Sequence, residues 1–145
     1  GSLLFGFAGL MAITVAPWEA RLVTPLQNLI PDRFDWNSLD RYPRSMVIIT
    51  SVYYFLFNGF VGPIVEELYF RGYLTSHVKR FGKAAALIVT ILFSLYHLWA
   101  PFANIFRIAV FLPAAYAAWK LKNIYVSMVC HCLCNIFSVI SFIAA

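Results

Sequence analysis

Residues 45–78 read SMVIITSVYYFLFNGFVGPIVEELYFRGYLTSHV and form the longest apolar run of the chain. It is largely apolar over about 34 positions, whereas one straight helix needs only about 20 residues to span a bilayer. The dipeptides Asn58-Gly59 and Gly62-Pro63 interrupt it and predict a break in the helix. The stretch is therefore either one overlong, kinked helix or a hairpin of two helices.

The rest of the chain has the same apolar character. Of its 145 residues, 62% are hydrophobic and 12% are charged, and the mean hydropathy is +0.78. A soluble domain of this size could not cover so much apolar surface. Further apolar runs occupy residues 3–17, 84–99, 101–119 and 124–144. We therefore expect an all-α, multi-pass transmembrane helical bundle with about five spans.

The basic residues predict how the helices are oriented. The loops at residues 79–83 and 120–123 carry +3 and +2, whereas the polar loop at 18–44 sums to zero. By the positive-inside rule both basic loops are cytoplasmic, which favours a single crossing by residues 45–78. Nucleic-acid binding would require a basic face on a soluble body, so we expect no nucleic-acid partner.

Three charged residues, Glu66, Glu67 and Arg71, lie inside the apolar stretch. A charge at membrane depth costs at least a few kcal/mol and usually marks a polar cavity, a proton path or a catalytic site. Glu67 and Arg71 have the i, i+4 spacing and orientation that best support an ion pair. We expect Arg71 to neutralise Glu67 as a brace, which leaves Glu66 as a general base for water. A purely structural ion network is the alternative.

Two further pairs, Phe93 with His97 and His131 with Asn135, are also spaced i, i+4, each on its own apolar segment. Counted from the cytoplasmic loops at 1.5 Å per residue, both histidines and Asn135 lie within about 8 Å of Glu66 in depth. This agreement predicts one shared polar site. Asn135 is expected to fix the histidine tautomer or to donate to an oxyanion. Phe93 either packs against His97 or is a plain core residue.

The sequence does not decide the role of some other polar residues, and it excludes several kinds of site. Arg107, with Asn104, either reaches the outer interface or holds the polar backbone of a substrate. The three cysteines between residues 130 and 134 are expected to be small packing residues rather than zinc ligands. All three aspartates lie in the loop at 18–44, so an intramembrane aspartyl dyad is excluded. There is no His-Glu-x-x-His zinc motif and no glycine-rich phosphate loop.

The charged and polar pairs, in this order, resemble the three motifs of the CPBP family: Glu66-Glu67-x-x-x-Arg71, Phe93-x-x-x-His97 and His131-x-x-x-Asn135. This family, also called Abi, comprises the CAAX proteases and bacteriocin-processing intramembrane proteases. The resemblance covers roughly residues 58–140. It implies that residues 45–145 form the protease domain, preceded at 1–44 by an N-terminal span and a polar interfacial loop. The short N-terminal region is expected to lack spans that full-length members have.

The resemblance also implies a set of catalytic residues: Glu66, Glu67, Arg71, His97, His131 and Asn135. In the family Glu66 is taken to activate water, Glu67 and Arg71 to support it, and the remaining three to bind the oxyanion or water. Members were first described as metal-dependent, so a divalent metal such as zinc on Glu66, His97 and His131 is the alternative. We favour a mechanism without a cofactor, because Arg71 opposes a bound cation.

The expected function is therefore that of an intramembrane endopeptidase of the CAAX type. We expect it in a prokaryotic cytoplasmic membrane, with its site open to the cytoplasmic side. The expected partners are membrane lipids and a peptide or membrane-associated protein substrate, either prenylated or a peptide precursor. Two alternatives remain at this point. One is a non-catalytic immunity or scaffold membrane protein, and the other is a proton-coupled transporter that uses Glu66 and the histidines.

Overall fold

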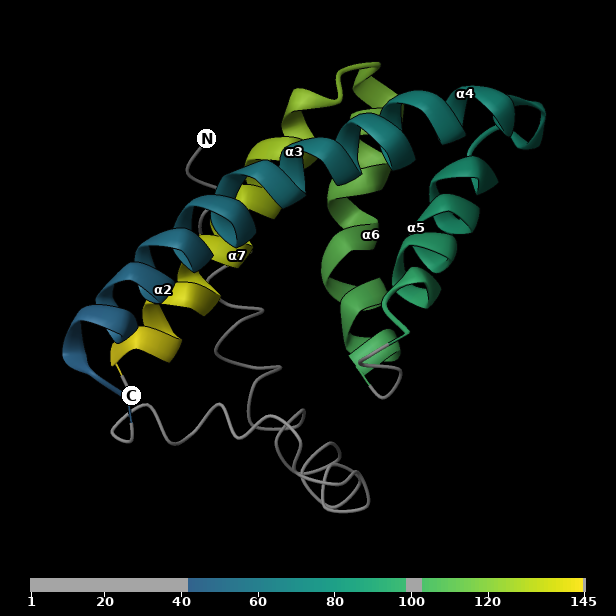
Figure 1. The fold of residues 1–145 in the computed structure, drawn as a ribbon. Helices are drawn as coiled ribbons and strands as arrows, with labels where there is room; N and C mark the ends of the chain where they lie inside the picture. The colour runs from purple at the N-terminus through teal and green to yellow at the C-terminus, as the bar shows by residue number, and fades with distance from the viewer. Residues whose placement is uncertain (1–41, 99–102, 145) are drawn as a thin grey trace.

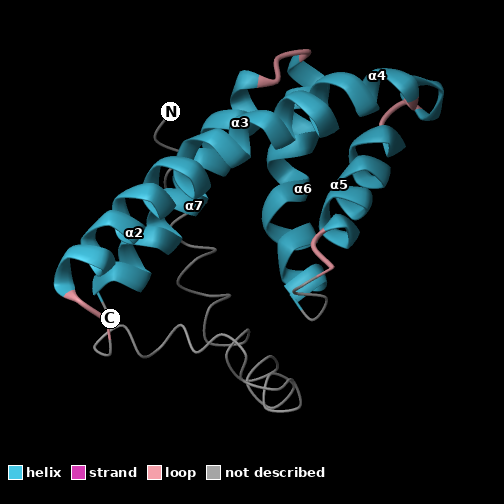
Figure 2. Cartoon of the chain, viewed as in Figure 1, coloured by secondary structure: helices cyan, strands magenta, loops and turns pink. Residues whose placement is uncertain are grey.

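The computed structural model describes residues 42–98 and 103–144, and the element labels below follow Figure 1. The predicted span at 3–17 and most of the polar loop at 18–44 lie outside the described residues. Within the described part every regular element is a helix and no strand occurs (Figure 2). The all-α class predicted from the sequence is thus confirmed.

Residues Arg44–His77 form one continuous helix, so the single kinked helix is confirmed and the hairpin is wrong. Among the described helices, this is the one long and apolar enough to cross a membrane. The expectation of five spans is therefore not confirmed. The long helix alternates α-helical and π-helical segments: α2 (Arg44–Leu56), η2 (Phe57–Val61), α3 (Gly62–Glu67), η3 (Leu68–Leu74) and α4 (Thr75–His77).

The first π-helical segment, η2, has its cause in the sequence. The main-chain N–H of Gly62 donates to the carbonyl of Phe57, five residues back, instead of four. The next bond of this pattern would join the Asn58 carbonyl to the nitrogen of Pro63, which carries no hydrogen. The proline thus leaves one carbonyl without its helical partner, and the predicted break is a widened turn within an unbroken helix.

At the end of the second π-helical segment, η3, one main-chain carbonyl accepts two hydrogen bonds. Both the main-chain N–H and the hydroxyl of Thr75 donate to the Phe70 oxygen, the hydroxyl at 2.9 Å. After α4 the chain turns through a short 3₁₀ helix, η4 (Lys79–Phe81), and Gly82, whose φ of +57° favours glycine. The first basic loop is therefore a tight turn.

Three more helices complete the described bundle: α5 (Ala84–Tyr96), α6 (Asn104–Leu121) and α7 (Tyr125–Ala144). They correspond closely to the apolar runs predicted from the sequence. Helices α5 and α6 pack side by side, and α7 lies along the first half of the long helix (Figure 1). At the end of α6, Lys122 adopts a left-handed conformation and the Asn123 N–H caps the Ala118 carbonyl at 3.0 Å.

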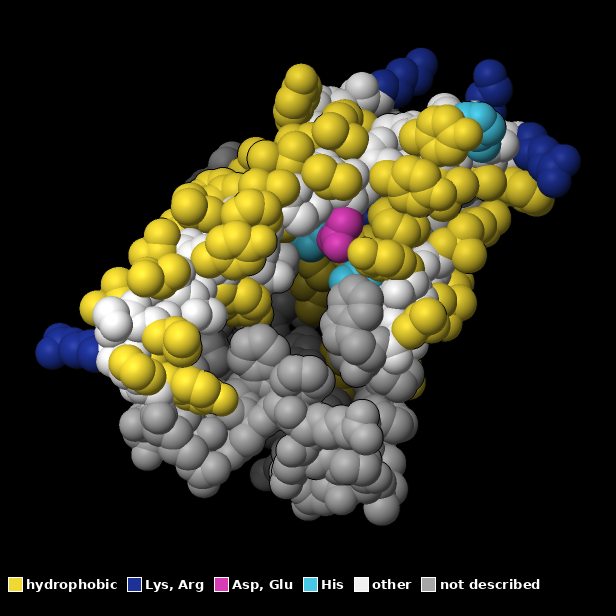
Figure 3. Space-filling view, in the orientation of Figure 1, with side chains coloured by type: hydrophobic (Ala, Val, Ile, Leu, Met, Phe, Trp, Pro, Cys, Tyr) yellow, Lys and Arg dark blue, Asp and Glu magenta, His cyan; other side chains and the backbone are white. Residues whose placement is uncertain are grey.

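Aromatic side chains form the core where α5, α6 and η3 meet. The buried cluster consists of Phe70, Val89, Phe93 and Phe111. The outer surface of the long helix is apolar instead of polar; Ile49, for example, is 69% exposed. Figure 3 shows Lys and Arg at the two ends of one face, with hydrophobic side chains between them. Such a surface suits a bilayer, whose interior accepts apolar side chains and excludes charges.

Candidate active site

Glu67 is the buried anchor of a polar cluster between the long helix and α7. It is fully buried, and its Oε1 lies 3.2 Å from Arg71 Nη1 and 3.0 Å from His131 Nδ1. The Arg71 contact is an ion pair without hydrogen-bond alignment, whereas the His131 contact is a hydrogen bond. A carboxylate oxygen only accepts hydrogen bonds, so His131 Nδ1 carries the proton of this bond. Both contacts are thus made by the same carboxylate oxygen of Glu67, Oε1.

Glu66, the residue before Glu67, faces the other nitrogen of the same imidazole. Its Oε2 lies 3.6 Å from His131 Nε2, which is beyond direct hydrogen-bond range. About a fifth of its side chain is exposed, in contrast to the fully buried Glu67. His131 therefore stands between the two carboxylates, with Nδ1 on the buried one and Nε2 toward the accessible one.

Phe93 contacts both histidines and the arginine. Its ring makes edge contacts with His97 and His131, at centroid distances of 4.9 and 5.4 Å. The guanidinium of Arg71 lies over the same ring, 4.4 Å from its centroid, in a cation–π contact. The structure thus shows Phe93, which is fully buried, packing against both histidines.

His97 follows the last residue of α5, where its main chain leaves the helical conformation. Its Nδ1 lies 2.8 Å from the Phe93 carbonyl, which can only accept a hydrogen bond. The proton is therefore on Nδ1, and Nε2 is the acceptor of the neutral ring. This bond one turn back along α5 holds the imidazole in position.

Asn135 lies one turn beyond His131 on α7, but it contacts the long helix. Its Nδ2 donates to the main-chain oxygen of Asn58 at 2.8 Å. The observed hydrogen-bond partner of His131 Nδ1 is Glu67, and that of Asn135 is Asn58. One of the two amide hydrogens of Asn135 is used by Asn58, which leaves the other for a ligand.

A cavity of about 690 Å³ joins these groups. Its lining includes Glu66, His97, His131 and Asn135, while Glu67 and Arg71 lie behind its wall. Figure 3 shows one acidic spot with histidine on both sides of it, on a face otherwise covered by hydrophobic side chains. The six residues predicted from the sequence thus come together in two layers, four on the cavity and two behind it.

The family model for Rce1-like type II CAAX prenyl endopeptidases matches residues 48–137, well over half of the chain. The chain belongs to the Rce1-like family. All three motifs that carried the resemblance lie inside the matched range. Membership supports a protease-type function in a membrane protein. No curated protein and no solved structure matched the chain.

The described part of this Rce1-like chain holds no group of three or more His, Cys, Asp or Glu side chains placed to bind one metal ion. Glu66 and His131 are near neighbours, and the Phe93 ring contacts both His131 and His97. The ligand set of the metal alternative is therefore not assembled in this arrangement. Arg71, 3.2 Å from Glu67, adds a positive charge to the same cluster.

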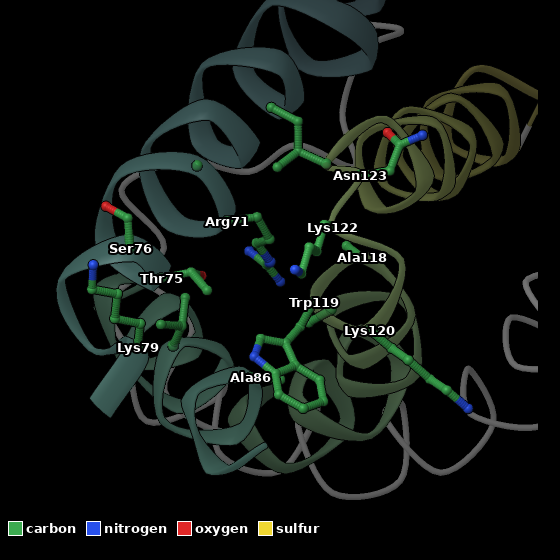
Figure 4. A pocket seen from close by; sticks show the side chains of 14 residues that line it. Arg71, Thr75, Ser76, Lys79, Ala86, Ala118, Trp119, Lys120, Lys122 and Asn123 are labelled. Carbon is green, nitrogen blue, oxygen red and sulfur yellow. The ribbon is translucent and has the colours of Figure 1, made fainter. Parts of the chain in front are cut away.

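A second cavity of the Rce1-like chain, of about 470 Å³, lies on the other side of Arg71 (Figure 4). Lys79 from the first basic loop and Lys120 and Lys122 from the second all line it. The two basic loops therefore meet at one end of the bundle. This arrangement agrees with the prediction from their charge that both loops lie on the same side of the membrane.

Sequence reasoning missed two polar features of this Rce1-like site. One is the main-chain carbonyl of Asn58. The only sign in the sequence that it would lack a helical hydrogen-bond donor was Pro63, five residues later. The other is a hydrogen-bonded group of Ser94, Asn104 and Arg107 that joins α5 to α6. Asn104 and Arg107 drew attention as a polar pair in an apolar segment, but nothing in the spacing pointed to Ser94.

Proposed function

We propose that the chain is an intramembrane endopeptidase in which Glu66 activates water for attack on a peptide bond. The observation that carries this proposal is the division of labour between the two carboxylates. Glu67 is occupied by Arg71 and His131, whereas Glu66 lines the cavity and is the one acidic side chain among the described residues there. A base that must reach water and substrate has to be the accessible one.

The proposed reaction begins with a water molecule held between Glu66 and His97 Nε2. Glu66 takes a proton from this water while the water oxygen attacks the carbonyl carbon of the substrate. The carbonyl oxygen becomes an oxyanion, to which the remaining N–H of Asn135 donates. Asn58 holds the amide in place through the other hydrogen.

His131 then orients the protonated Glu66. Once Glu66 is protonated, its O–H can donate to His131 Nε2, which lies 3.6 Å away in the resting arrangement. Glu66 next gives the proton to the leaving amine as the tetrahedral intermediate collapses. The products are a new carboxylate and a new amine, so one water is consumed and Glu66 returns to its starting state.

The substrate class follows from the family to which the chain belongs. We propose a peptide or protein with a prenylated cysteine close to its C-terminus, as the type II CAAX prenyl endopeptidase name indicates. Membrane lipids are the other proposed partner. The proposed setting is a multi-pass bundle of about five spans whose cytoplasmic end carries the two basic loops.

The test is cleavage of a prenylated CAAX peptide by purified protein, comparing the wild type with Glu66→Gln. Glutamine is nearly isosteric but cannot accept the proton, so we expect almost no product from a folded variant. Arg80→Gln, in an exposed turn away from the cavity, is the control and should retain wild-type activity. Full cleavage by Glu66→Gln would refute the role of this residue as the base. A proton-coupled transporter would instead show pH-gradient transport and no peptide product.

A further inference from the structure

The second cavity, of about 470 Å³, gathers positive charge at the end of the bundle where the two basic loops meet. Lys79 lines it from the first loop, and Lys120 and Lys122 line it from the second. No acidic side chain is among its described lining residues, and the two carboxylates of the described part belong to the active-site cluster. The three lysines therefore share one cavity without an anionic partner in the described part of the chain, although like charges repel one another.

Arg71 forms the buried inner wall of this cavity. It is 6% exposed, and its Nε and Nη2 have no hydrogen-bond partner among the described residues. Its Nη1 lies 3.2 Å from Glu67 as an ion pair without hydrogen-bond alignment. A buried donor without an acceptor is costly, and more so on a charged group. Figure 4 shows the Arg71 and Lys122 side chains directed toward the middle of the cavity, so its deep end is the more strongly positive one.

The rest of the lining combines hydrogen-bond donors with small apolar side chains. The Asn123 side-chain oxygen accepts a bond from the Tyr125 main-chain N–H at 3.0 Å, which leaves the amide hydrogens of Asn123 as donors. Trp119, which is half-buried, adds an indole N–H. The apolar part of the lining includes Val89 and Ala115. A ligand for this cavity therefore needs an anionic part and tolerates an apolar one.

We infer that the second cavity binds a phosphate group, held by lysines from both basic loops. Phosphate carries negative charge and several acceptor oxygens, and lysine is a common ligand for it. Basic pockets between membrane helices on the cytoplasmic side bind the head groups of anionic lipids, whose phosphate stands on an apolar glycerol ester. A bound phosphate would join the turn after α4 to the turn after α6. The inference is independent of the proposed reaction, because binding requires no cleavage.

The experiment titrates the purified chain in detergent with three probes. Phosphatidylglycerol is anionic, phosphatidylcholine has a phosphate but no net charge, and inorganic phosphate has no apolar part. Native mass spectrometry measures the fraction of chains with one bound lipid, and the thermal unfolding midpoint reports inorganic phosphate. We expect phosphatidylglycerol to bind more tightly than phosphatidylcholine. A midpoint raised by inorganic phosphate would extend the site to free phosphate, whereas an unchanged midpoint would assign it to the lipid.

Matched double variants locate the site. Lys79→Gln with Lys122→Gln removes one lysine from each loop, and we expect about 25-fold weaker binding of phosphatidylglycerol, roughly fivefold for each lysine. Arg80→Gln with Lys83→Gln removes the same charge at exposed positions outside the cavity lining and should bind like the wild type. Equal losses in the two double variants would overturn the inference, because general surface charge would explain them. Equal binding of the two lipids by the wild type would overturn it as well.

Discussion

The side-chain amide of Asn135 donates a 2.8 Å hydrogen bond to the main-chain oxygen of Asn58, in the first π-helical segment. This carbonyl is the one whose helical partner would be the nitrogen of Pro63. The Asn135 side chain thus satisfies a main-chain group that the proline leaves unpaired. The bond ties α7 to the long helix and places the last of the three motifs against the first.

We therefore predict that Asn135→Ala lowers stability as well as activity. A buried carbonyl without a partner costs about 1–3 kcal/mol, and loss of an oxyanion donor lowers the rate by about 10²–10³. Denaturant unfolding in detergent and peptide cleavage measure the two effects. Pro63→Ala returns an N–H to the helix, so Asn135→Ala should cost less stability in that background. Equal costs in both backgrounds would contradict the proposed link between the proline and Asn58.

The two adjacent glutamates should respond differently to the same substitution. Glu67→Gln breaks a buried ion pair with Arg71 and is expected to cost about 3–5 kcal/mol in stability. Glu66→Gln removes a partly exposed group and should change stability little, while lowering the rate by more than about 10³. Thermal unfolding and cleavage by the same preparations make the comparison. A stable, active Glu67→Gln variant would contradict the bracing role of this residue.

The proposed mechanism predicts that a chelator leaves cleavage unchanged. The described residues hold no group of three or more side chains placed to bind one metal ion, and Arg71 adds a positive charge beside Glu67. His97→Ala and His131→Ala should lower the rate without changing the metal content of the purified protein. Elemental analysis alongside the cleavage assay tests both statements. Stoichiometric zinc, with activity lost on its removal and restored on its return, would overturn the metal-free proposal.

The orientation of the bundle can be tested at its two basic loops. In a background without the three native cysteines, Phe81→Cys and Lys122→Cys each place one thiol in an exposed turn. Both should react with an impermeant reagent from the cytoplasmic side only, because the second cavity brings the two loops to one end. Labelling of either cysteine only from outside would contradict the proposed topology.

Part of this site was predictable because it depends on residues that are close together in the sequence. The i, i+4 spacing of Glu67 and Arg71 indicated their ion pair, and hydropathy gave helices α5 to α7 within a few residues. The contact between Asn135 and Asn58 was not predictable, because it depends on a hydrogen-bond pattern that side-chain periodicity does not reveal. The same holds for the contact of Phe93 with both histidines, which follows from how three helices pack together.

The division of the site between two distant helices also sets when it can form during synthesis. Glu67 and His131 are 64 residues apart, and His131 lies on the last described helix. A growing chain emerges from its N-terminal side, so both glutamates enter the membrane before the imidazole that stands between them. A nascent chain that stops within α6 therefore carries both glutamates without His131. The polar cluster can form only after α7 has been inserted.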